Sequence, residues 1–519
     1  MGIYFKSFGT HAEYQEFKDN SGFTVNPNIA VCRYDYHAHF NGDEDIPPEP
    51  PTPTHDYLTF IAQEDGTFRF YGSQTANTLS YSLDNGTTWT ALAHNTDTPI
   101  VSSGSSIMWK GSGLYPKQLD GIGKFVSSGR YEAEGNVMSI VRGDNFATAT
   151  TVKQDEFSNL FGGSTGLTTA ENLALPATTL AYNCYYNMFR GCTSLTQAPE
   201  LPATTLAEGC YYEMFGNCTN LTTAPALPAT RLAEDCYYMM FYGCTSLTTV
   251  FSTLPATTLV QECYSRMFEG CSSLTGVPTN YLPATTLANY CYDSMFEGCS
   301  SLTTVPELPA TTLADGCYGG MFRYCSGLTK APELPATTLT IRCYEYMFQG
   351  CSGLTQAPEL PATTLASYCY QGMFKHCTNL TDVSSDYLPA TTLAEYCYSG
   401  MFSGCTSFTT APELPATTIT NYCYSSMFAG CTSLTQAPEL PATTLKSGCY
   451  SHMFDSCRKL NYIKCLATDI SAYPCTSYWV AGVASTGTFI KDATMTSWTT
   501  GYNGIPSNWT IQDASSSGS

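Results

Sequence analysis

The stretch Leu201-Pro202-Ala203-Thr204-Thr205-Leu206, followed by Cys210-Tyr211, Met214-Phe215 and Cys218, decides the fold, because the chain contains eleven copies of it. The first cysteines of the copies are Cys184, Cys210, Cys236, Cys263, Cys291, Cys317, Cys343, Cys369, Cys397, Cys423 and Cys449. Their spacing is 26 to 28 residues throughout. A fixed period of this length, with leucines at fixed offsets, predicts a leucine-rich solenoid in which each copy forms one coil.

Each copy is numbered here from its first cysteine, as position 0. Every copy has Tyr at +1, Met at +4, Phe at +5 and Cys at +8. At about 100° per residue these positions share an arc of roughly 140° on a helix. The positions that change between copies, +2, +3 and +6, fall on the opposite side. The pattern therefore predicts one helix per copy, with the fixed face in the core, and the Gly at +7 of most copies is expected to end it.

The return stretch of each copy is short and contains prolines such as Pro199 and Pro225, so it predicts one short parallel strand per coil. The fold class expected is an α/β leucine-rich-repeat solenoid preceded by a small all-β domain. In that domain, turn signals at Asp65-Gly66 and Asp84-Asn85-Gly86 predict hairpins.

Composition divides the chain into five parts. Residues 1–46 are expected to form an N-terminal attachment segment, 47–55 a Pro-rich linker and 56–150 the small β domain. Residues 151–457 form the solenoid, which begins with a degenerate N-terminal cap where Ser164 replaces the second cysteine. Residues 458–519 form a C-terminal cap and a flexible tail.

The chain is acidic, with 22 Lys and Arg, 43 Asp and Glu and a formal net charge of −21. This balance argues against a nucleic-acid partner, which would require a basic surface. No run of about 18 apolar residues is present, so no membrane span is predicted. The N-terminus lacks the basic and then apolar layout of a secretion signal.

The repeat cysteines are 22 of the 25 in the chain. Two cysteines eight residues apart on a helix lie about 12 Å apart, which excludes a shared zinc ion or a disulfide within one copy. Two alternatives remain: reduced cysteines in buried ladders, which we favour, or disulfides between coils. No metal or cofactor is predicted. One alternative, calcium binding, stays open for a recurring acidic column: Glu200, Glu307, Glu333, Glu359, Glu413 and Glu439.

No catalytic set is visible, because the seven histidines are scattered and none recurs with a nucleophile. The protein is therefore predicted not to be an enzyme; a glycosidase within the β domain is the alternative. Two short motifs have plain structural explanations. Ser82-x-Asp84-x-Gly86-x-Thr88-Trp89 resembles an Asp-box, or is a hairpin whose Asp satisfies its own turn. Arg142-Gly143-Asp144 spells a cell-adhesion tripeptide, or is a coincidence.

The changing positions −1, +2 and +3 are rich in Tyr, Ser, Gly and Asn, a composition typical of adaptable binding surfaces. Neutral drift on a solvated face explains the same variation, and the strand side is a rival binding surface. The candidate ligand-binding residues are Tyr186, Tyr212, Tyr238, Arg266, Asp293, Tyr290, Tyr346, Tyr368, Tyr396 and Tyr422.

The phrases Leu201–Leu206 and Met240–Leu247 resemble the BspA-type leucine-rich repeat family, although Met-Phe stands where the family usually has Ala-Phe. Members are surface adhesins of anaerobic bacteria and related organisms. Residues 127–139 and 482–509 are similar to modules that accompany such repeats in proteins of gut bacteria and their phages. Residues 27–32 loosely resemble a motif at the start of some virion-attached phage proteins.

These resemblances imply a non-enzymatic recognition protein. The first expectation is a phage virion fibre or receptor-binding protein, located on the virion and a homo-oligomer. Its N-terminal segment would bind other virion proteins, and its solenoid a host-surface or mucus glycan or protein. The alternatives are a bacterial cell-surface adhesin of the BspA type and a structural virion decoration without a ligand.

Overall fold

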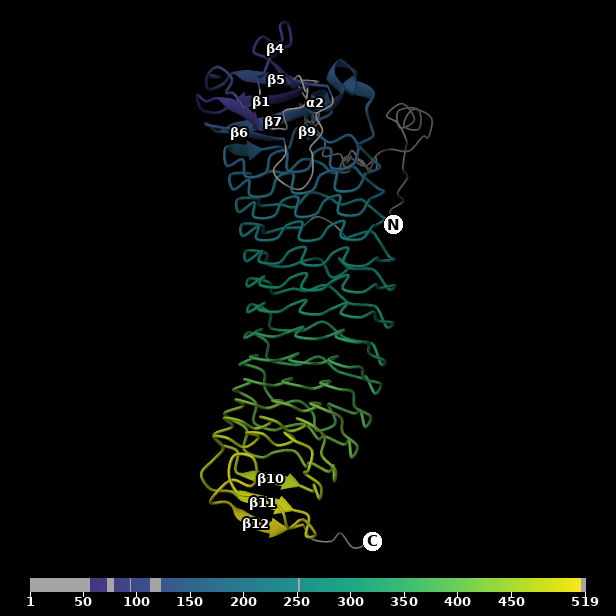
Figure 1. Cartoon of the computed structure of the whole chain (residues 1–519), viewed down its shortest axis with the longest axis vertical. Helices are drawn as coiled ribbons and strands as arrows, with labels where there is room; N and C mark the ends of the chain where they lie inside the picture. The colour runs from purple at the N-terminus through teal and green to yellow at the C-terminus, as the bar shows by residue number, and fades with distance from the viewer. Residues whose placement is uncertain (1–56, 72–78, 94, 113–122, 251–252, 515–519) are drawn as a thin grey trace, which may run out of the picture. The chain divides into compact units, whose positions relative to one another are not determined.

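The computed structural model describes residues 57–71, 79–93, 95–112, 123–250 and 253–514. The attachment segment, the linker and the motif at residues 27–32 lie outside these residues. The described part belongs to one compact unit. In Figure 1 it begins with β-strands and continues as coils that follow one another in sequence order, from teal to yellow.

The β domain is built on one mixed sheet with strand order β4-β3-β5-β1-β7-β8, in which β8 (Leu167–Thr169) comes from the first coil, and β2 and β6 form a separate short pair. The strands of the domain are β1 (Leu58–Ala62), β2 (Phe68–Tyr71), β3 (Ser80–Ser82), β4 (Thr90–Ala91), β5 (Ser106–Lys110), β6 (Lys124–Ser127) and β7 (Tyr131–Asn136). The hairpin predicted around residues 84–86 is confirmed, because β3 pairs antiparallel with β4. The hairpin expected around residues 65–66 is wrong: β1 pairs with β5 and β7, and β2 pairs with β6. Two short helical segments, α2 (Ser139–Arg142) and η1 (Gly143–Thr148), follow β7.

The β domain is continuous with the solenoid. Strand β7 pairs in parallel with β8 (Leu167–Thr169) and β9 (Leu173–Ala174), which belong to the degenerate first coil. Phe125 of the domain stacks on Phe161 of that coil, with ring centroids 6.1 Å apart. Ser164, which replaces the second cysteine, shares a 3.0 Å hydrogen bond with the Tyr131 hydroxyl. The degenerate first coil, predicted as an N-terminal cap, is therefore covered by the sheet.

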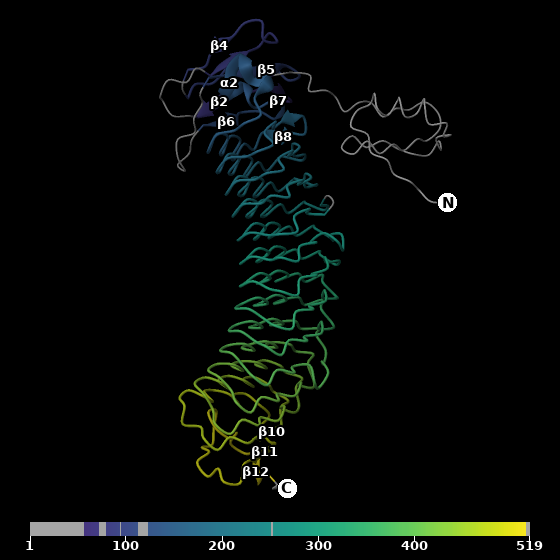
Figure 2. The same cartoon turned by 90° about the vertical axis from the view of Figure 1, so that its right-hand side faces the viewer.

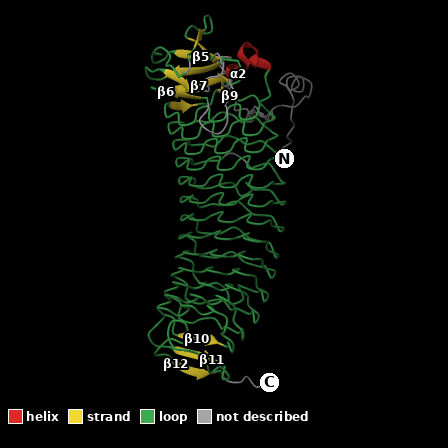
Figure 3. Cartoon of the chain, in the orientation of Figure 1, coloured by secondary structure: helices red, strands yellow, loops and turns green. Residues whose placement is uncertain are grey.

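The helix predicted in each copy is wrong. In the described residues of the eleven copies the segment from −1 to +8 is a run of tight turns, drawn as loop in Figure 3. Every second amide bonds three residues back in its own coil, as from Tyr186 to the Asn183 carbonyl at 3.1 Å. The intervening amides bond the next coil, as from Tyr185 to the Cys210 carbonyl at 3.0 Å. An α-helix satisfies its amides internally, so only the turn arrangement joins neighbouring coils by backbone hydrogen bonds.

The turns repeat every four residues, and positions −1, +3 and +7 adopt left-handed backbone conformations in all eleven copies. In the first copy these are Asn183, Asn187 and Gly191, with φ of 50°, 55° and 72°. As a result, two successive side chains point into the core and the next two point away from it. The Gly at +7 is thus a left-handed turn residue within a continuing series, and no helix ends there.

The fixed positions form the core, as predicted. Met214, Phe215 and their counterparts in the other copies are fully buried. The +5 phenylalanines stack face to face from Phe161 to Phe454, with centroids 5.2 to 5.9 Å apart. The +1 tyrosines make a second buried stack, which Trp479 closes at the C-terminal end, 6.2 Å from Tyr450. Burial of large aromatic rings is the main source of stability in such a stack.

The repeat cysteines are free and buried, which agrees with the reduced-ladder alternative. The thiol at +8 donates to the carbonyl of the +5 phenylalanine one coil earlier in all eleven copies, at 3.0 to 3.2 Å. Cys192 bonding Phe161 is the first example. Burial raises the pKa of Cys192 to about 12, so the thiol keeps the proton that this hydrogen bond needs.

The return stretches do not form the predicted strand in each coil. They form single parallel bridges in two columns, such as Thr223 with Thr249 and Thr179 with Thr205. After β9, the described residues form regular strands again only at the C-terminal end, where β10 (Tyr462–Cys465), β11 (Thr488–Lys491) and β12 (Thr510–Asp513) form a parallel sheet. Figure 2 shows these three strands beside the last coils. A solenoid is therefore confirmed, but its coils are built of turns and bridges.

Candidate ligand-binding surface

The side chains at −1, +2, +3, +6 and +7 lie on the outer side of the turns, and we call this surface the turn face. At three of these positions the backbone is left-handed in every copy. A residue other than Gly in this conformation costs about 1 kcal/mol. Even so, Tyr occupies −1 in four copies and Gly in only three. Large side chains thus occupy positions at which glycine would have less backbone strain.

Three of the candidate residues form a row at +2. Tyr186 stacks on Tyr212 and Tyr212 on Tyr238, with ring centroids 4.9 and 4.8 Å apart. All three are half-buried. Burial raises the pKa of each hydroxyl, so the groups stay protonated and can donate hydrogen bonds at neutral pH.

A second row lies at −1, near the C-terminal end of the solenoid. Tyr368, Tyr396 and Tyr422 stack with centroids 4.7 Å apart and ring planes within 8° of parallel. The coils of Tyr396 and Tyr422 carry small residues at +2 and +3, such as Ser399 and Gly400. This part of the turn face therefore presents tyrosine edges and hydroxyls next to serine and glycine backbone.

Arg266 and Asp293 belong to a different, charged part of the turn face. Arg266 pairs with Glu269 at 3.0 Å. Burial raises the pKa of Asp293 to about 7, an effect that the nearby Arg266 only partly opposes. The structure thus places these two candidate residues among charged neighbours, away from the tyrosine row at Tyr368–Tyr422.

Tyr290 and Tyr346 stand outside both rows, and each ring lies over a glycine of the next coil. A Cβ added to Gly316 would be 2.3 Å from the Tyr290 ring, and one added to Gly372 would be 2.4 Å from the Tyr346 ring. Tyr422 and Gly448 are related in the same way, at 2.1 Å. The glycines therefore make room for the tyrosines of the preceding coil.

Sequence reasoning missed four residues of this surface. The Arg323 guanidinium lies 4.8 Å from the centre of the Tyr324 ring and 5.8 Å from that of Tyr346. Arg342 covers the Tyr368 ring at 4.5 Å, which extends the row at −1 by one coil. Lys375 lies at +6, two coils after Arg323 in the same column. The available signal was Tyr324 at +7, where most copies have Gly.

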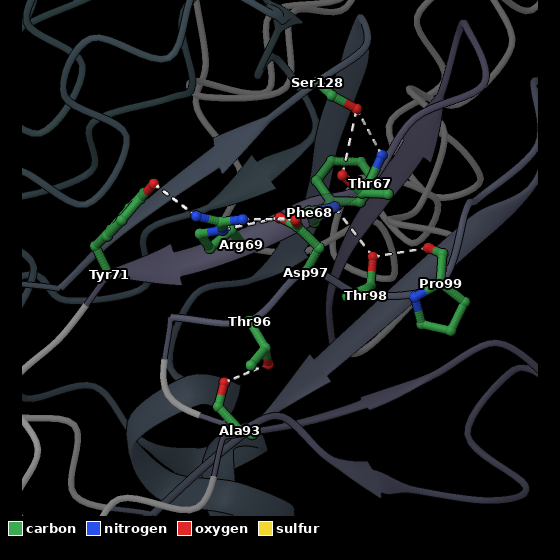
Figure 4. Close-up of polar contacts among 10 residues, drawn as sticks. All are labelled: Thr67, Phe68, Arg69, Tyr71, Ala93, Thr96, Asp97, Thr98, Pro99 and Ser128. Atoms are coloured by element: carbon green, nitrogen blue, oxygen red, sulfur yellow. Dashed lines mark hydrogen bonds and ion pairs between the residues drawn. The ribbon is translucent and has the colours of Figure 1, made fainter.

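The polar side chains of two clusters in the β domain form hydrogen bonds and ion pairs with one another. Figure 4 shows the ion pair of Arg69 with Asp97, whose closest atoms are 2.6 Å apart, and the hydrogen bond from Arg69 to the Tyr71 hydroxyl. In the Asp-box-like turn, Asp84 accepts hydrogen bonds from the amide and the hydroxyl of Thr88. These bonds lower the pKa of Asp84, so the turn explains this carboxylate without a ligand.

The adhesion tripeptide is also used structurally. Arg142 pairs with buried Glu156 at 2.5 Å, and Asp144 accepts hydrogen bonds from Lys110 and from the Tyr57 hydroxyl. Neither charge is presented on a free loop, which favours the coincidence interpretation.

In the described part of the chain, no three His, Cys, Asp or Glu side chains gather as a metal site would require. One residue of the acidic column, Glu439, pairs with Lys464 at 2.8 Å. Within the same residues no helix has the length and apolar character needed to cross a bilayer.

The repeats match a known family. The model of the BspA-type leucine-rich repeat region matches residues 168–318, 211–355, 292–427 and 369–474, so the matches together span more than half of the chain. The chain belongs to the BspA-type leucine-rich repeat family. A comparison with curated proteins found no match. BspA-type repeats indicate an adhesion or recognition role, and their members are often exposed at surfaces.

Proposed function

We propose that this BspA-type protein is a non-enzymatic adhesion protein that binds a glycan on its turn face. The observation that supports the proposal is the stacked row of Tyr368, Tyr396 and Tyr422 in left-handed backbone positions. A tyrosine offers an apolar ring edge and a hydroxyl with little conformational entropy to lose. Sugars present the matching combination of C–H groups and hydroxyls.

In its finer form, the proposal is a phage virion fibre or receptor-binding protein, homo-oligomeric and attached to other virion proteins through residues 1–46. The sequence resemblances at residues 127–139 and 482–509 support the phage setting. A bacterial cell-surface adhesin is the second candidate, which family membership supports equally. Labelling of intact phage particles and of bacterial cells with an antibody to the solenoid distinguishes the two.

Binding is tested with the full chain on an array of host-surface and mucus glycans. We expect retention of a subset of glycans, and at least tenfold weaker binding after Tyr368→Gly and Tyr396→Gly are combined. Glycine is compatible with this backbone, since Gly209, Gly316 and Gly448 occupy the same column.

The matched control combines Tyr186→Ser and Tyr212→Ser in the other row, where Ser265 and Ser399 show that serine is accepted at +2. Loss only in the control would move the site to the row at +2. An array without any bound glycan would contradict the proposed function and would favour a structural decoration.

A further inference from the structure

Positive charge on the turn face is concentrated in three consecutive coils. Arg323, Arg342 and Lys375, here called the basic cluster, lie in the coils that begin at Cys317, Cys343 and Cys369. The preceding coils carry mainly acidic residues on the same face, for example Glu213, Asp235, Glu262 and Glu269. In a chain with a net charge of −21, such a local group of cations contrasts with its surroundings.

Aromatic rings hold the two guanidinium groups in place. Arg323 lies over Tyr324 and donates to its hydroxyl at 3.1 Å, and Arg342 lies over Tyr368. Tyr346 lies near both guanidinium groups. Burial raises the pKa of Tyr346, and the charges of Arg323 and Arg342 oppose part of this rise. A stacked guanidinium keeps its plane fixed while its N–H groups remain available at the edge.

The acidic partners of the basic cluster leave donors unused. Arg323 is 3.4 Å from Glu297, a loose pair, and Arg342 donates one short hydrogen bond to Glu345 at 2.8 Å. A guanidinium has five N–H donors, so each pair uses only part of the available set. No ion pair of Lys375 is found among the described residues.

Buried polar atoms without partners lie beside the basic cluster. The Arg323 Nε, the Gln349 Oε1 and the Gln371 Oε1 atoms are buried and have no hydrogen-bond partner in the described structure. Gln349 is only 7 % exposed and lies in the column between Arg323 and Lys375. Buried polar atoms are rarely left unpaired, so these three atoms have hydrogen-bonding capacity that the chain itself does not fill.

Large side chains in left-handed positions also concentrate here. Tyr324, Arg342, Tyr346, Tyr368 and His376 all have φ between 54° and 63° within these coils. The same positions are left-handed in every copy, so what distinguishes these coils is the size of the side chains that the strained positions carry.

We propose that the basic cluster, with Tyr324, Tyr346 and Gln349, binds the carboxylate or sulfate of an acidic glycan. The planar fork of a guanidinium matches both anions. Sugar hydroxyls would pair with the tyrosine hydroxyls and the amide, and the next sugar units would continue along Tyr368, Tyr396 and Tyr422. The inference rests on the proposed glycan-binding function and specifies the chemistry of the ligand.

The test uses the full chain and probes that differ only in charge. These are an oligogalacturonate and its neutral methyl ester for the carboxylate, and dextran sulfate and dextran for the sulfate. We expect calorimetric titration to show binding of at least one acidic probe, with the neutral counterpart at least tenfold weaker. Equal binding of the two members of both pairs, or no binding of either acidic probe, would overturn the inference.

Variants locate the site. Arg323→Gln combined with Arg342→Gln should weaken binding of the acidic probe at least tenfold. Arg323→Lys, which keeps the positive charge, should retain more of the binding than Arg323→Gln. The control Arg190→Gln removes a cation from the same +6 column five coils away, where Arg190 pairs with Glu213, and should leave binding unchanged. Circular dichroism confirms folding; the comparison of probes on the unaltered chain stands even if a variant misfolds.

The two proposals fail in different ways. If neutral glycans bind through the tyrosine row and the arginine variants have no effect, the acidic-glycan inference falls while the proposed function stands. If no glycan of either kind binds in the array or in solution, the proposed function falls as well.

Discussion

At the residue scale, the two cysteines of each copy differ in the hydrogen bonds that their thiols make. Both are buried, but only the +8 thiol has a regular acceptor, the phenylalanine carbonyl one coil earlier. A disulfide would remove that donor, so the hydrogen bond gives a physical reason for reduced sulfur at +8. Burial raises the pKa of these thiols, as at Cys192 and Cys244, so they stay protonated and can donate.

Cys325→Ala should therefore destabilise the protein more than Cys317→Ala. Cys325 donates to the Phe296 carbonyl at 3.1 Å, whereas the described residues show no hydrogen bond donated by the equally buried Cys317 thiol. We expect the difference to be about 0.5 to 1 kcal/mol, the net value of one hydrogen bond. Urea unfolding, with amide exchange to report on these coils, measures it. Equal losses would show that the thiol hydrogen bond contributes nothing.

Asp293 should give stability a pH dependence opposite to that of ordinary carboxylates. Its pKa is raised by burial to about 7 in the folded protein, against 3.8 in the reference state. Between about pH 4 and 7 the folded state takes up a proton that the unfolded chain does not bind. Stability should thus fall as pH rises through this window, by at most about 1.4 kcal/mol per pH unit, and stay low above it.

Asp293→Asn should flatten this dependence and raise the unfolding midpoint at pH 8. Urea midpoints of both proteins at pH 4, 6 and 8 provide the measurement. Asp235, whose pKa burial raises to about 6, retains a similar dependence in the variant, so some slope remains. An unchanged slope would mean that Asp293 is ionised in the folded protein at neutral pH.

At the scale of the element, the coil is a series of four-residue turns, and at several positions a large side chain of one coil is followed by a glycine in the next. A large left-handed side chain in one coil lies over a glycine in the next, as with Tyr324 and Gly350. The turn face is thus shaped by pairs of positions about 26 residues apart. Substitutions at these glycines should act on the preceding tyrosine as well as on the local backbone.

Gly350→Ala should cost more than Gly430→Ala. Both glycines are left-handed, with φ of 75° and 74°, so each pays about 1 kcal/mol for the backbone. A Cβ at Gly350 would lie 2.4 Å from the Tyr324 ring, whereas one at Gly430 would meet only Gly404, at 3.6 Å. We expect Gly350→Ala also to displace Tyr324 and to weaken binding of an acidic probe. Urea unfolding and titration of both variants test this; identical behaviour would show that the Tyr324 ring moves freely.

Periodicity was enough to predict the coil and its core but not the turn. In the turn series, two side chains that point into the core alternate with two that point outward, which is a period of 4.0 residues. A helix has a period of 3.6 residues, so the two patterns drift apart by only about 40° every four residues, too little to distinguish within nine residues. Position +7 carried the missing information, because it is mostly Gly but is Asn, Tyr, His or Ser in single copies. The tyrosine row at −1 was predictable, since equivalent positions of successive coils must stack. The contacts of Arg323 with Tyr324 and Tyr346 depend on the turn geometry, so spacing alone could not provide them.

At the scale of the whole molecule, each coil contacts only the coils before and after it, and the aromatic stacks run through all of them. The β domain closes one end through Phe125 and Phe161, and Trp479 closes the other. Stability in such an array is a sum of coil and neighbour terms. Coils are thus interchangeable units as long as the register of the stacks is kept.

Deletion of residues 423–448, one complete copy of 26 residues, should leave a folded protein with one coil fewer, because Tyr398 and Phe402 can stack on Tyr450 and Phe454 and Tyr422 then directly precedes Cys449. Deletion of residues 423–435, half a copy, should disrupt the C-terminal coils, since core and surface positions no longer align. Circular dichroism and size-exclusion chromatography compare the two. A folded half-copy deletion would contradict the register argument.

The alternation of amides bonded within a coil and amides bonded to the next coil also determines how the protein responds to tension. If both ends of the solenoid are pulled apart, the terminal coils can detach singly, because each is held only by its neighbour. One released coil of 26 residues lengthens the chain by up to about 90 Å. Such stepwise unfolding dissipates mechanical energy while the remaining coils stay folded, a useful property for a protein that carries load.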